Sequence, residues 1–303
     1  MHPLHRYLIA ELVHHHRSGE LSRRDALAGL ASVVGVGAAG QLLAGCAPHA
    51  PLAAPAPVVS PDHVPPDDPA VACHVASIPA EDGPITAAVA RPASGEPAPV
   101  VLVCHANRGL NAYTRDVTRR LAKRGYVAAA VDLLSRAGGT DALSERRIWR
   151  ALGEAPPGRH ARDFAAAIPY LRAQPWVVQR FGMIGFCFGG GVTWQVAIEV
   201  PELLAAVPFY GVPPAADRVG AIRAEVLGIY AGLDRIVPPE VVSPIAAAME
   251  LAGARFESRT YPDANHAFHD DTGGAYHPEA AAAAWTEAMG WLDRCLRAIP
   301  AEQ

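Results

Sequence analysis

The chain has 303 residues, half of them hydrophobic, which is long enough to bury one large α/β core with additional segments. Its formal net charge of −4 at pH 7 provides no basic surface for a phosphate backbone, so we expect no nucleic-acid partner. The five cysteines are too few and too irregularly spaced for a disulfide framework, and none form the Cys-x-x-Cys pair of a zinc site. These features favour a globular enzyme or binding protein.

The first 45 residues have the features of an export signal. Residues 22–27 read SRRDAL, with a pair of arginines, and a Gly/Ala-rich apolar run follows over residues 28–45. This pattern is typical of a Tat-type signal peptide. The run ends in LAGC, which resembles the lipobox of bacterial lipoproteins and makes Cys46 the expected lipidated residue. A transmembrane helix is the alternative, which the glycines and the uncharged C-terminal flank disfavour.

The sequence therefore predicts three regions. Residues 1–45 form the signal, residues 46–69 form an Ala/Pro-rich extended tether, and residues 70–303 form the folded unit. We expect export by the Tat route to the periplasm or the cell surface. A lipid on Cys46 would then hold the protein at a membrane.

Within the folded unit, apolar periodicity and turn signals predict alternating strands and helices. Expected strands, the first two as an antiparallel hairpin, cover residues 71–79, 84–92, 99–105, 126–134, 180–186, 204–210, 225–231 and 256–261. Expected helices cover residues 111–125, 160–173, 188–200, 241–252 and 278–298. This alternation predicts an α/β fold with a doubly wound, mostly parallel sheet.

The stretch GFCFGGG, residues 185–191, places a cysteine between an apolar run and three glycines. A strand, a tight Gly-x-Cys-x-Gly turn and a helix are the pattern of a nucleophile elbow. In such an elbow the glycines allow strand and helix backbones to approach closely, and the central residue is held on a strained turn. Cys187 is therefore the candidate nucleophile, where serine is more usual.

A thiol nucleophile needs a base, and the base needs an orienting carboxylate. Asp234 and His266 each follow a predicted strand, and functional residues of doubly wound sheets gather at the carboxyl ends of strands. The order nucleophile, acid, histidine is that of the α/β-hydrolase fold. Each residue also has an ordinary structural interpretation, and His269 or His277 could be the base instead.

An oxyanion hole is expected beside the thiol. One donor is the backbone N–H of Phe188, the residue after the nucleophile. The second is expected from the loop HANRGLN that follows the third strand, with Asn107 as the candidate.

With these residues in place, the sequence resembles the dienelactone hydrolase family. The likeness covers essentially all of the folded unit and rests on GFCFGGG, AGLDRIVP, ANHAFHDD, RGLNAYTRDVTRRLAKRGYVAAAVDLLSR and AAAAAWTEAMGWL. The resemblance implies an α/β-hydrolase fold with a Cys–Asp–His triad, carried here by Cys187, Asp234 and His266. It further implies opening of a lactone or cleavage of an ester through an acyl-thiol intermediate, without a metal or cofactor.

Two positions depart from the family pattern. Members commonly have a glutamate just after the third strand that contacts the nucleophile, and the matching residue here is Ala106. Enzymes specific for dienelactone place an arginine four residues after the histidine to hold the substrate carboxylate. That position is Asp270 here, followed by Asp271, so an anionic substrate would be repelled and dienelactone itself is not the expected substrate.

Three further residues are candidates for substrate contact. Arg108 and Arg136 lie in loops expected at the carboxyl edge of the sheet, and Tyr210 ends the strand after the elbow helix. A role as ordinary loop residues and a packed tyrosine is equally compatible with the pattern. Of the other cysteines, Cys73 and Cys104 are interpreted as small buried side chains. The pairing of Cys73, Cys104 and Cys295 in disulfides is left open.

Two other functions remain open at this point. Class I glutamine amidotransferases also have a Gly-x-Cys-x-Gly elbow with a later His-x-Glu pair, which Cys187, His277 and Glu279 would supply. That alternative leaves AGLDRIVP and ANHAF unexplained. A lipoprotein that keeps the hydrolase fold as a non-catalytic binding module is the other alternative, supported by Ala106. The preferred hypothesis is a cofactor-free hydrolase of a small ester or lactone.

Overall fold

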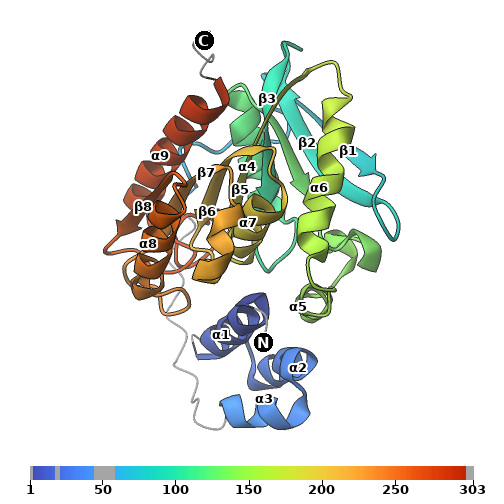
Figure 1. The fold of residues 1–303 in the computed structure, drawn as a ribbon. Helices are drawn as coiled ribbons and strands as arrows, with labels where there is room; N and C mark the ends of the chain where they lie inside the picture. Colours follow the sequence, from blue (N-terminus) through green and yellow to red (C-terminus); the bar gives the residue numbers. More distant parts are fainter. Residues whose placement is uncertain (1–2, 18–20, 44–58, 298–303) are drawn as a thin grey trace.

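The computed structural model describes residues 3–17, 21–43 and 59–297, and its centre is an eight-stranded sheet (Figure 1). The strand order is β1-β2-β4-β3-β5-β6-β7-β8. The strands are β1 (Val71–Ile78), β2 (Ile85–Pro92), β3 (Ala98–Cys104), β4 (Val127–Val131), β5 (Val177–Phe186), β6 (Leu203–Phe209), β7 (Glu225–Ala231) and β8 (Phe256–Tyr261). All eight predicted strands are confirmed, with small shifts at their ends.

The sheet is mostly parallel, as predicted. β1 and β2 form the expected antiparallel hairpin, β2 pairs antiparallel with β4, and every other pair from β4 to β8 is parallel. β3 and β5 are central, and the side chains of Val100 to Cys104 and of Phe181 to Phe186 are almost fully buried. These near-continuous apolar runs are what a strand covered on both faces requires.

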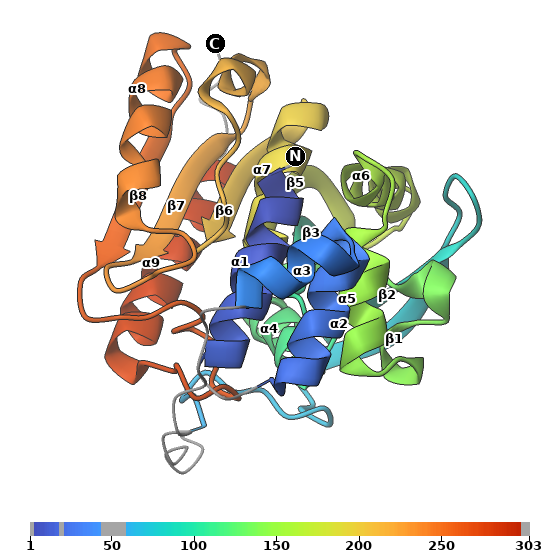
Figure 2. The same cartoon turned by 90° about the horizontal axis from the view of Figure 1, so that it is seen from below.

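Helices cover both faces of the sheet. These helices are α4 (Ala112–Lys123), α6 (Arg159–Arg172), α7 (Phe188–Glu199), α8 (Ser243–Leu251) and α9 (Pro278–Arg297), whereas α5 (Glu145–Gly153) packs mainly against helices near the N-terminus. α4 and α9 pack on one face, and α6, α7 and α8 pack on the other (Figures 1 and 2). The helix α5 was not predicted. It buries Ile148, Trp149 and Leu152, but one glutamate and three arginines among its nine residues obscure the apolar pattern.

Three further helices precede the sheet, in the region expected to be a signal. They are α1 (Pro3–Arg17), α2 (Arg23–Val34) and α3 (Val36–Leu43). Figure 2 shows them together in front of the middle of the sheet, with α1 beside α7 and α2 beside α5. Gly29 of α2 permits the close contact with α1, because a Cβ atom there would lie 2.7 Å from a methyl carbon of Leu12. No helix in the described residues is both long and apolar enough to span a membrane.

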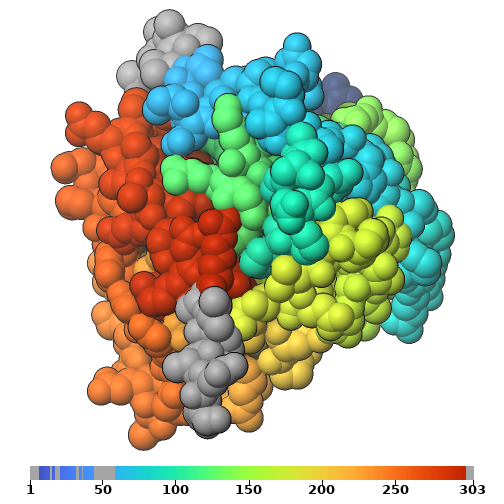
Figure 3. Space-filling model, turned by 90° about the horizontal axis from the view of Figure 1, so that it is seen from above, coloured from blue at the N-terminus to red at the C-terminus, as the bar shows by residue number. Residues whose placement is uncertain are grey.

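Contacts between the expected tether and the sheet domain begin ahead of Ala70. The backbone N–H of Ser60 donates to Asp271, and that of Val64 donates to Asp116, at 3.1 and 2.8 Å. In Figure 3, which views the face opposite to that of Figure 2, the light-blue residues of this segment lie beside the red residues of α9. The expected lipidation residue, Cys46, falls outside the described residues.

Candidate active site

The predicted elbow is present at the end of β5. Cys187 has φ 61° and ψ −119°, a backbone conformation that L-residues rarely adopt, and α7 begins at the next residue. Glycines on either side make this turn sterically possible. A Cβ atom on Gly185 would lie 2.3 Å from the carbonyl oxygen of Gly189, and one on Gly189 would lie 2.5 Å from that of Cys104. The thiol therefore lies at the junction of β5, β3 and α7.

Asp234 and His266 come together from the loops after β7 and β8. Oδ2 of Asp234 lies 2.7 Å from Nδ1 of His266, and both side chains are buried. The other carboxylate oxygen accepts hydrogen bonds from the backbone N–H groups of Ile236 and Val237, at 2.8 and 2.9 Å. Those bonds fix the carboxylate, and the carboxylate fixes the ring, so that Nε2 is directed away from Asp234 and toward the cysteine.

Two side chains of α1 contact both the thiol of Cys187 and Nε2 of His266. The hydroxyl oxygen of Tyr7 lies 2.5 Å from Sγ of Cys187 and 3.0 Å from Nε2. Oε1 of Glu11 lies 3.0 Å from Nε2 and 3.5 Å from Sγ. Tyr7 also donates to Glu11 across one helical turn, at 2.5 Å. This network closes the site to solvent, since Cys187 is 5 % exposed.

Glu11 also engages the loop after β3. Its Oε2 atom accepts a hydrogen bond of 2.8 Å from the side-chain amide of Asn107, the candidate second donor of the oxyanion hole. The neighbouring Ala106, where the family commonly has a glutamate, contributes only its backbone carbonyl to a bond of 2.7 Å with Nδ1 of His105. The carboxylate beside the thiol thus comes from the N-terminal helix. This contact was not predicted, because residues 1–45 were interpreted as an export signal.

Burial and neighbouring charge shift the pKa values of these groups. Burial raises the pKa of the Cys187 thiol, the negative charge of Glu11 raises it further, and His266 opposes both. Burial lowers the pKa of His266, but the carboxylates of Asp234 and Glu11 outweigh burial and hold that pKa well above its usual value. With α1 in place, the site therefore favours a protonated histidine and a neutral thiol.

The other predicted residues have mixed positions. Phe188 is the first residue of α7 and is buried, as an elbow donor must be. The ring of Tyr210 lies 5.0 Å from that of His266, centroid to centroid, and helps to fix it. Arg136 forms two bonds of 2.9 Å with the carboxylate of Asp163, so its guanidinium has a structural role. Arg108 is half-buried near Asp270, and its positive charge lowers the pKa of Asp270 against the larger effect of burial.

The alternative bases do not join this network. His269 is buried and bonded to the hydroxyl of Tyr113 at 2.6 Å, and burial with the nearby Arg120 lowers its pKa to about 3. His277 lies directly before α9, where its Nδ1 accepts from the backbone N–H of Ala280, and Glu279 is in the first turn of that helix. A histidine that caps a helix has an ordinary structural explanation.

The other three cysteines in the described residues, Cys73, Cys104 and Cys295, are free thiols. Cys104 is buried in β3, as predicted, and Cys295 is buried on α9. The prediction of a buried Cys73 is wrong, because β1 is the edge strand of the sheet and Cys73 faces solvent there.

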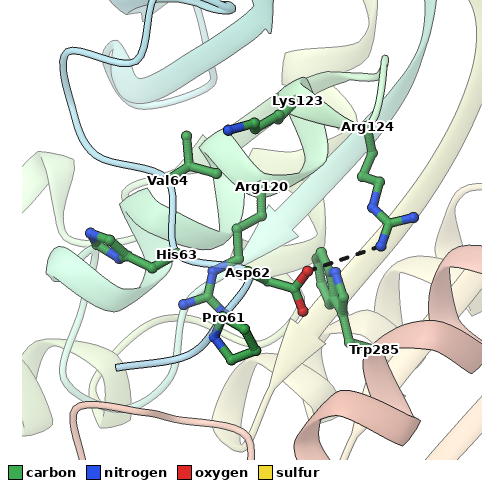
Figure 4. Close-up of a pocket in the computed structure, with 8 residues that line it drawn as sticks. All are labelled: Pro61, Asp62, His63, Val64, Arg120, Lys123, Arg124 and Trp285. Atoms are coloured by element: carbon green, nitrogen blue, oxygen red, sulfur yellow. Dashed lines mark ion pairs between the residues drawn. The ribbon is translucent and has the colours of Figure 1, made fainter. Parts of the chain in front are cut away.

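A surface hollow of about 310 Å³ lies elsewhere, between α4, α9 and residues 61–64 (Figure 4). Its basic side chains are engaged: Arg120 with Asp116 and Asp271, Lys123 with Asp68, and Arg124 with Asp62. Donor atoms of Glu11, Cys187 and His266 lie within 4.8 Å of one another, a set that could hold a metal ion. These atoms instead bond directly to each other and to Tyr7.

Comparison with known proteins agrees with this geometry. Residues 85–296 match the dienelactone hydrolase family. A protein of Methylorubrum extorquens that bears the name carboxymethylenebutenolidase is 33 % identical over 228 residues, which cover 71 % of this chain and 78 % of the relative.

Solved structures give the same result. A crystal structure described as a dienelactone hydrolase from Klebsiella pneumoniae has a TM-score of 0.69 and 30 % identity, over 74 % of this chain and 99 % of that one. A dienelactone hydrolase-like promiscuous phosphotriesterase from metagenomic libraries has a TM-score of 0.67 and 26 % identity, over 75 % of this chain and 99 % of that one. The chain belongs to the dienelactone hydrolase family and is a lactone or ester hydrolase.

Proposed function

We propose that Cys187, His266 and Asp234 form a catalytic triad that hydrolyses a small ester or lactone through an acyl-thiol intermediate. The observation that carries the proposal is the 2.7 Å bond between Asp234 and Nδ1 of His266, which leaves Nε2 for the thiol on the strained turn. In this arrangement Asp234 fixes the ring tautomer and stabilises the imidazolium that forms.

The reaction proceeds in two balanced halves. Nε2 of His266 takes the thiol proton, and the thiolate of Cys187 attacks the ester carbonyl to give a tetrahedral oxyanion. The C–O bond breaks, the alkoxide takes the proton from His266, and a thioester remains. Water then gives a proton to His266 and attacks the thioester, and collapse of the second tetrahedral species releases the carboxylic acid and restores the thiol.

The oxyanion is stabilised by the two predicted donors. The N–H of Phe188 is at the N-terminus of α7, where the helix dipole also favours negative charge. The candidate for the second donor is the backbone N–H of Asn107, a residue that is buried and whose side-chain amide bonds to Glu11. For a lactone the alkoxide stays attached to the acyl group, so a single ring-opened hydroxy acid is released.

The substrate is a neutral or weakly polar acyl compound. Asp270 and Asp271 follow the histidine loop, and no arginine is present at the position where dienelactone-specific enzymes hold a carboxylate. Tyr210 and Phe186 add aromatic surface near His266 and Asp270. An uncharged ester or lactone therefore suits this site better than dienelactone.

We also propose that the protein is exported by the Tat route and held at a membrane by a lipid on Cys46. The support is the arginine pair at residues 23 and 24, the apolar run after it and the LAGC sequence. Labelling cells with a radioactive fatty acid tests the anchor. Label in the wild-type protein but not in Cys46→Ala is expected, and equal label in both would overturn it.

The test of the hydrolase uses a panel of short aryl esters and lactones. A recognition site for a sequence-specific protease is inserted between residues 43 and 59 of the full chain. This chain and its Cys187→Ala form are assayed before and after cleavage. Turnover that disappears with the cysteine supports the triad. No turnover, together with a Cys187 that iodoacetamide does not modify in the cleaved chain, would overturn it in favour of a binding role.

A further inference from the structure

We propose that α1 is an internal inhibitor of the hydrolase site, and that a chain break between Leu43 and Val59 converts the closed enzyme into the open one. This inference rests on the proposed function. It concerns the state in which the helices α1 to α3 lie against the sheet domain, the state that the structure shows (Figures 1 and 2).

The first argument is occupancy. Two groups that must touch substrate in the proposed reaction, the thiol of Cys187 and Nε2 of His266, contact side chains of α1. Sγ of Cys187 lies 2.5 Å from the hydroxyl oxygen of Tyr7, Nε2 of His266 lies 3.0 Å from both Tyr7 and Glu11, and the amide of Asn107 donates to Glu11 at 2.8 Å. An ester carbonyl cannot approach the thiol while these two side chains remain.

The second argument is the protonation state. A carboxylate inserted beside a buried thiol disfavours the thiolate, and the same carboxylate beside the imidazole favours the imidazolium. Glu11 acts on both partners in this way. The histidine therefore holds its proton when it should accept one, so α1 removes the nucleophile chemically as well as sterically.

The third argument is the construction of the docked segment. Tyr7 and Glu11 are four residues apart and share one helical face with Leu8 and Leu12, all at most 2 % exposed. A buried glutamate is unfavourable without partners, and here each oxygen of Glu11 has one. Complementarity of charge and hydrogen bonding identifies the ligand of the open site as an amphipathic helix that presents a tyrosine and a glutamate one turn apart.

The fourth argument is connectivity. The helices α1 to α3 continue into the domain only through residues 44–58. While that link is intact, docking is intramolecular, and the effective concentration of the helix at the site is on the order of millimolar. A break makes the inhibitor a separate molecule at the concentration of the enzyme itself, so dilution releases it. Processing before Cys46, as proposed above, would make such a break.

The first experiment compares three full chains by the rate at which iodoacetamide modifies Cys187, read from its peptide by mass spectrometry so that Cys73 does not interfere. The chains are wild type, the double variant Tyr7→Ala/Glu11→Ala, and Gln41→Ala, a matched control on the exposed side of α3. We expect modification at least about tenfold faster in the double variant, from the loss of several hydrogen bonds to buried groups, and no change in the control. Equal rates in all three would overturn the proposal.

The second experiment uses the chain with the inserted protease sequence. After cleavage and dilution, modification of Cys187 and ester hydrolysis should both rise, and a synthetic peptide of residues 3–43 should reverse both. The same peptide with Tyr7→Ala and Glu11→Ala should not.

The outcomes separate the two proposals. If cleavage speeds the modification of Cys187 but no ester is hydrolysed, α1 does cover the cysteine and the proposed hydrolase activity is overturned. Cysteine-dependent hydrolysis at one rate before and after cleavage keeps the hydrolase and overturns the inhibitor. A fall in hydrolysis on Glu11→Gln in the intact chain would also overturn the inhibitor, because it would make Glu11 a residue that assists the reaction.

Discussion

The two ring nitrogens of His266 each face a buried carboxylate, and we propose that the two carboxylates have opposite effects on the reaction. Asp234 bonds to Nδ1 at 2.7 Å and belongs to a loop of the sheet, whereas Glu11 bonds to Nε2 at 3.0 Å and belongs to the N-terminal helix. The contacts are chemically alike. In the proposed mechanism the first prepares the ring to accept a proton from the thiol, and the second occupies the nitrogen that would accept it. On this proposal, the position of a carboxylate relative to the path of the proton decides whether it activates or blocks the reaction.

The largest expected effect comes from neutralising each carboxylate in turn. Asp234→Asn in the cleaved chain should lower kcat by about 10³- to 10⁴-fold, because the ring loses the partner that fixes its tautomer. Glu11→Gln in the intact chain should act in the opposite direction and raise the rate of Cys187 modification. Steady-state kinetics and alkylation rates measure the two. Changes of the same sign would show that the two contacts do not differ in the way proposed.

A second prediction concerns the nucleophile elbow, where α7 packs closely against the end of β3. Gly189→Ala would place a Cβ atom 2.5 Å from the backbone oxygens of Cys104 and His105. Because backbone atoms cannot move aside without an energetic cost, we expect the free energy of unfolding to fall by about 1–3 kcal/mol, measured by urea denaturation. Gly274→Ala is the control, since no atom lies within 4 Å of its Cβ position. An unchanged midpoint for Gly189→Ala would contradict the close packing at the elbow.

A third prediction concerns pH. The folded-state pKa of His266 is raised above its unfolded value of about 6.5. Its ion pairs therefore stabilise the closed chain fully below that pH, and this contribution is lost as pH rises through the raised pKa. Cys187, whose pKa is also raised, acts in the same direction. The Tm of the intact chain should fall toward alkaline pH, and Glu11→Gln should reduce that dependence; an identical profile for both would count against the contact.

The smallest effect is expected at the contact between α1 and α2. Gly29→Val adds atoms where a Cβ already meets Leu12 at 2.7 Å. The leucine end is flexible, so the helices shift rather than unfold, and we expect modification of Cys187 to rise only about two- to fivefold. Gly37→Ala, with open space around its Cβ position, serves as the comparison. A decrease in the rate would mean that the α1–α2 contact does not support docking.

The sheet and the contact between Asp234 and His266 could be predicted from sequence. The strands are strongly apolar runs with clear breaks, and the elbow and the residues after β7 and β8 are local motifs. The contact between Glu11 and His266 could not be predicted, because Tyr7 and Glu11 reach the site only through tertiary contacts with residues far along the chain. One local pattern did point to a packed helix, since Tyr7 and Glu11 are four residues apart on a helical face shared with Leu8 and Leu12. The interpretation of residues 1–45 as a signal left it unused.

Smaller differences have similar causes. Cys73 was predicted to be buried because its neighbours are apolar, but the edge position of β1 depends on strand order, which composition does not reveal. Arg136 was a candidate for substrate contact because of its loop. Its partner Asp163 lies on α6, and only the tertiary structure brings the two together.

The contact between Tyr7 and His266 joins residues 259 positions apart. During synthesis the helix leaves the ribosome first, and the surface that receives it is completed only when the loop after β8 has been made. For most of translation the N-terminal helices therefore have no finished binding site. On the proposed export route, the arginine pair is therefore synthesised and exposed before the site can close, and α1 can dock only after the rest of the domain has been made.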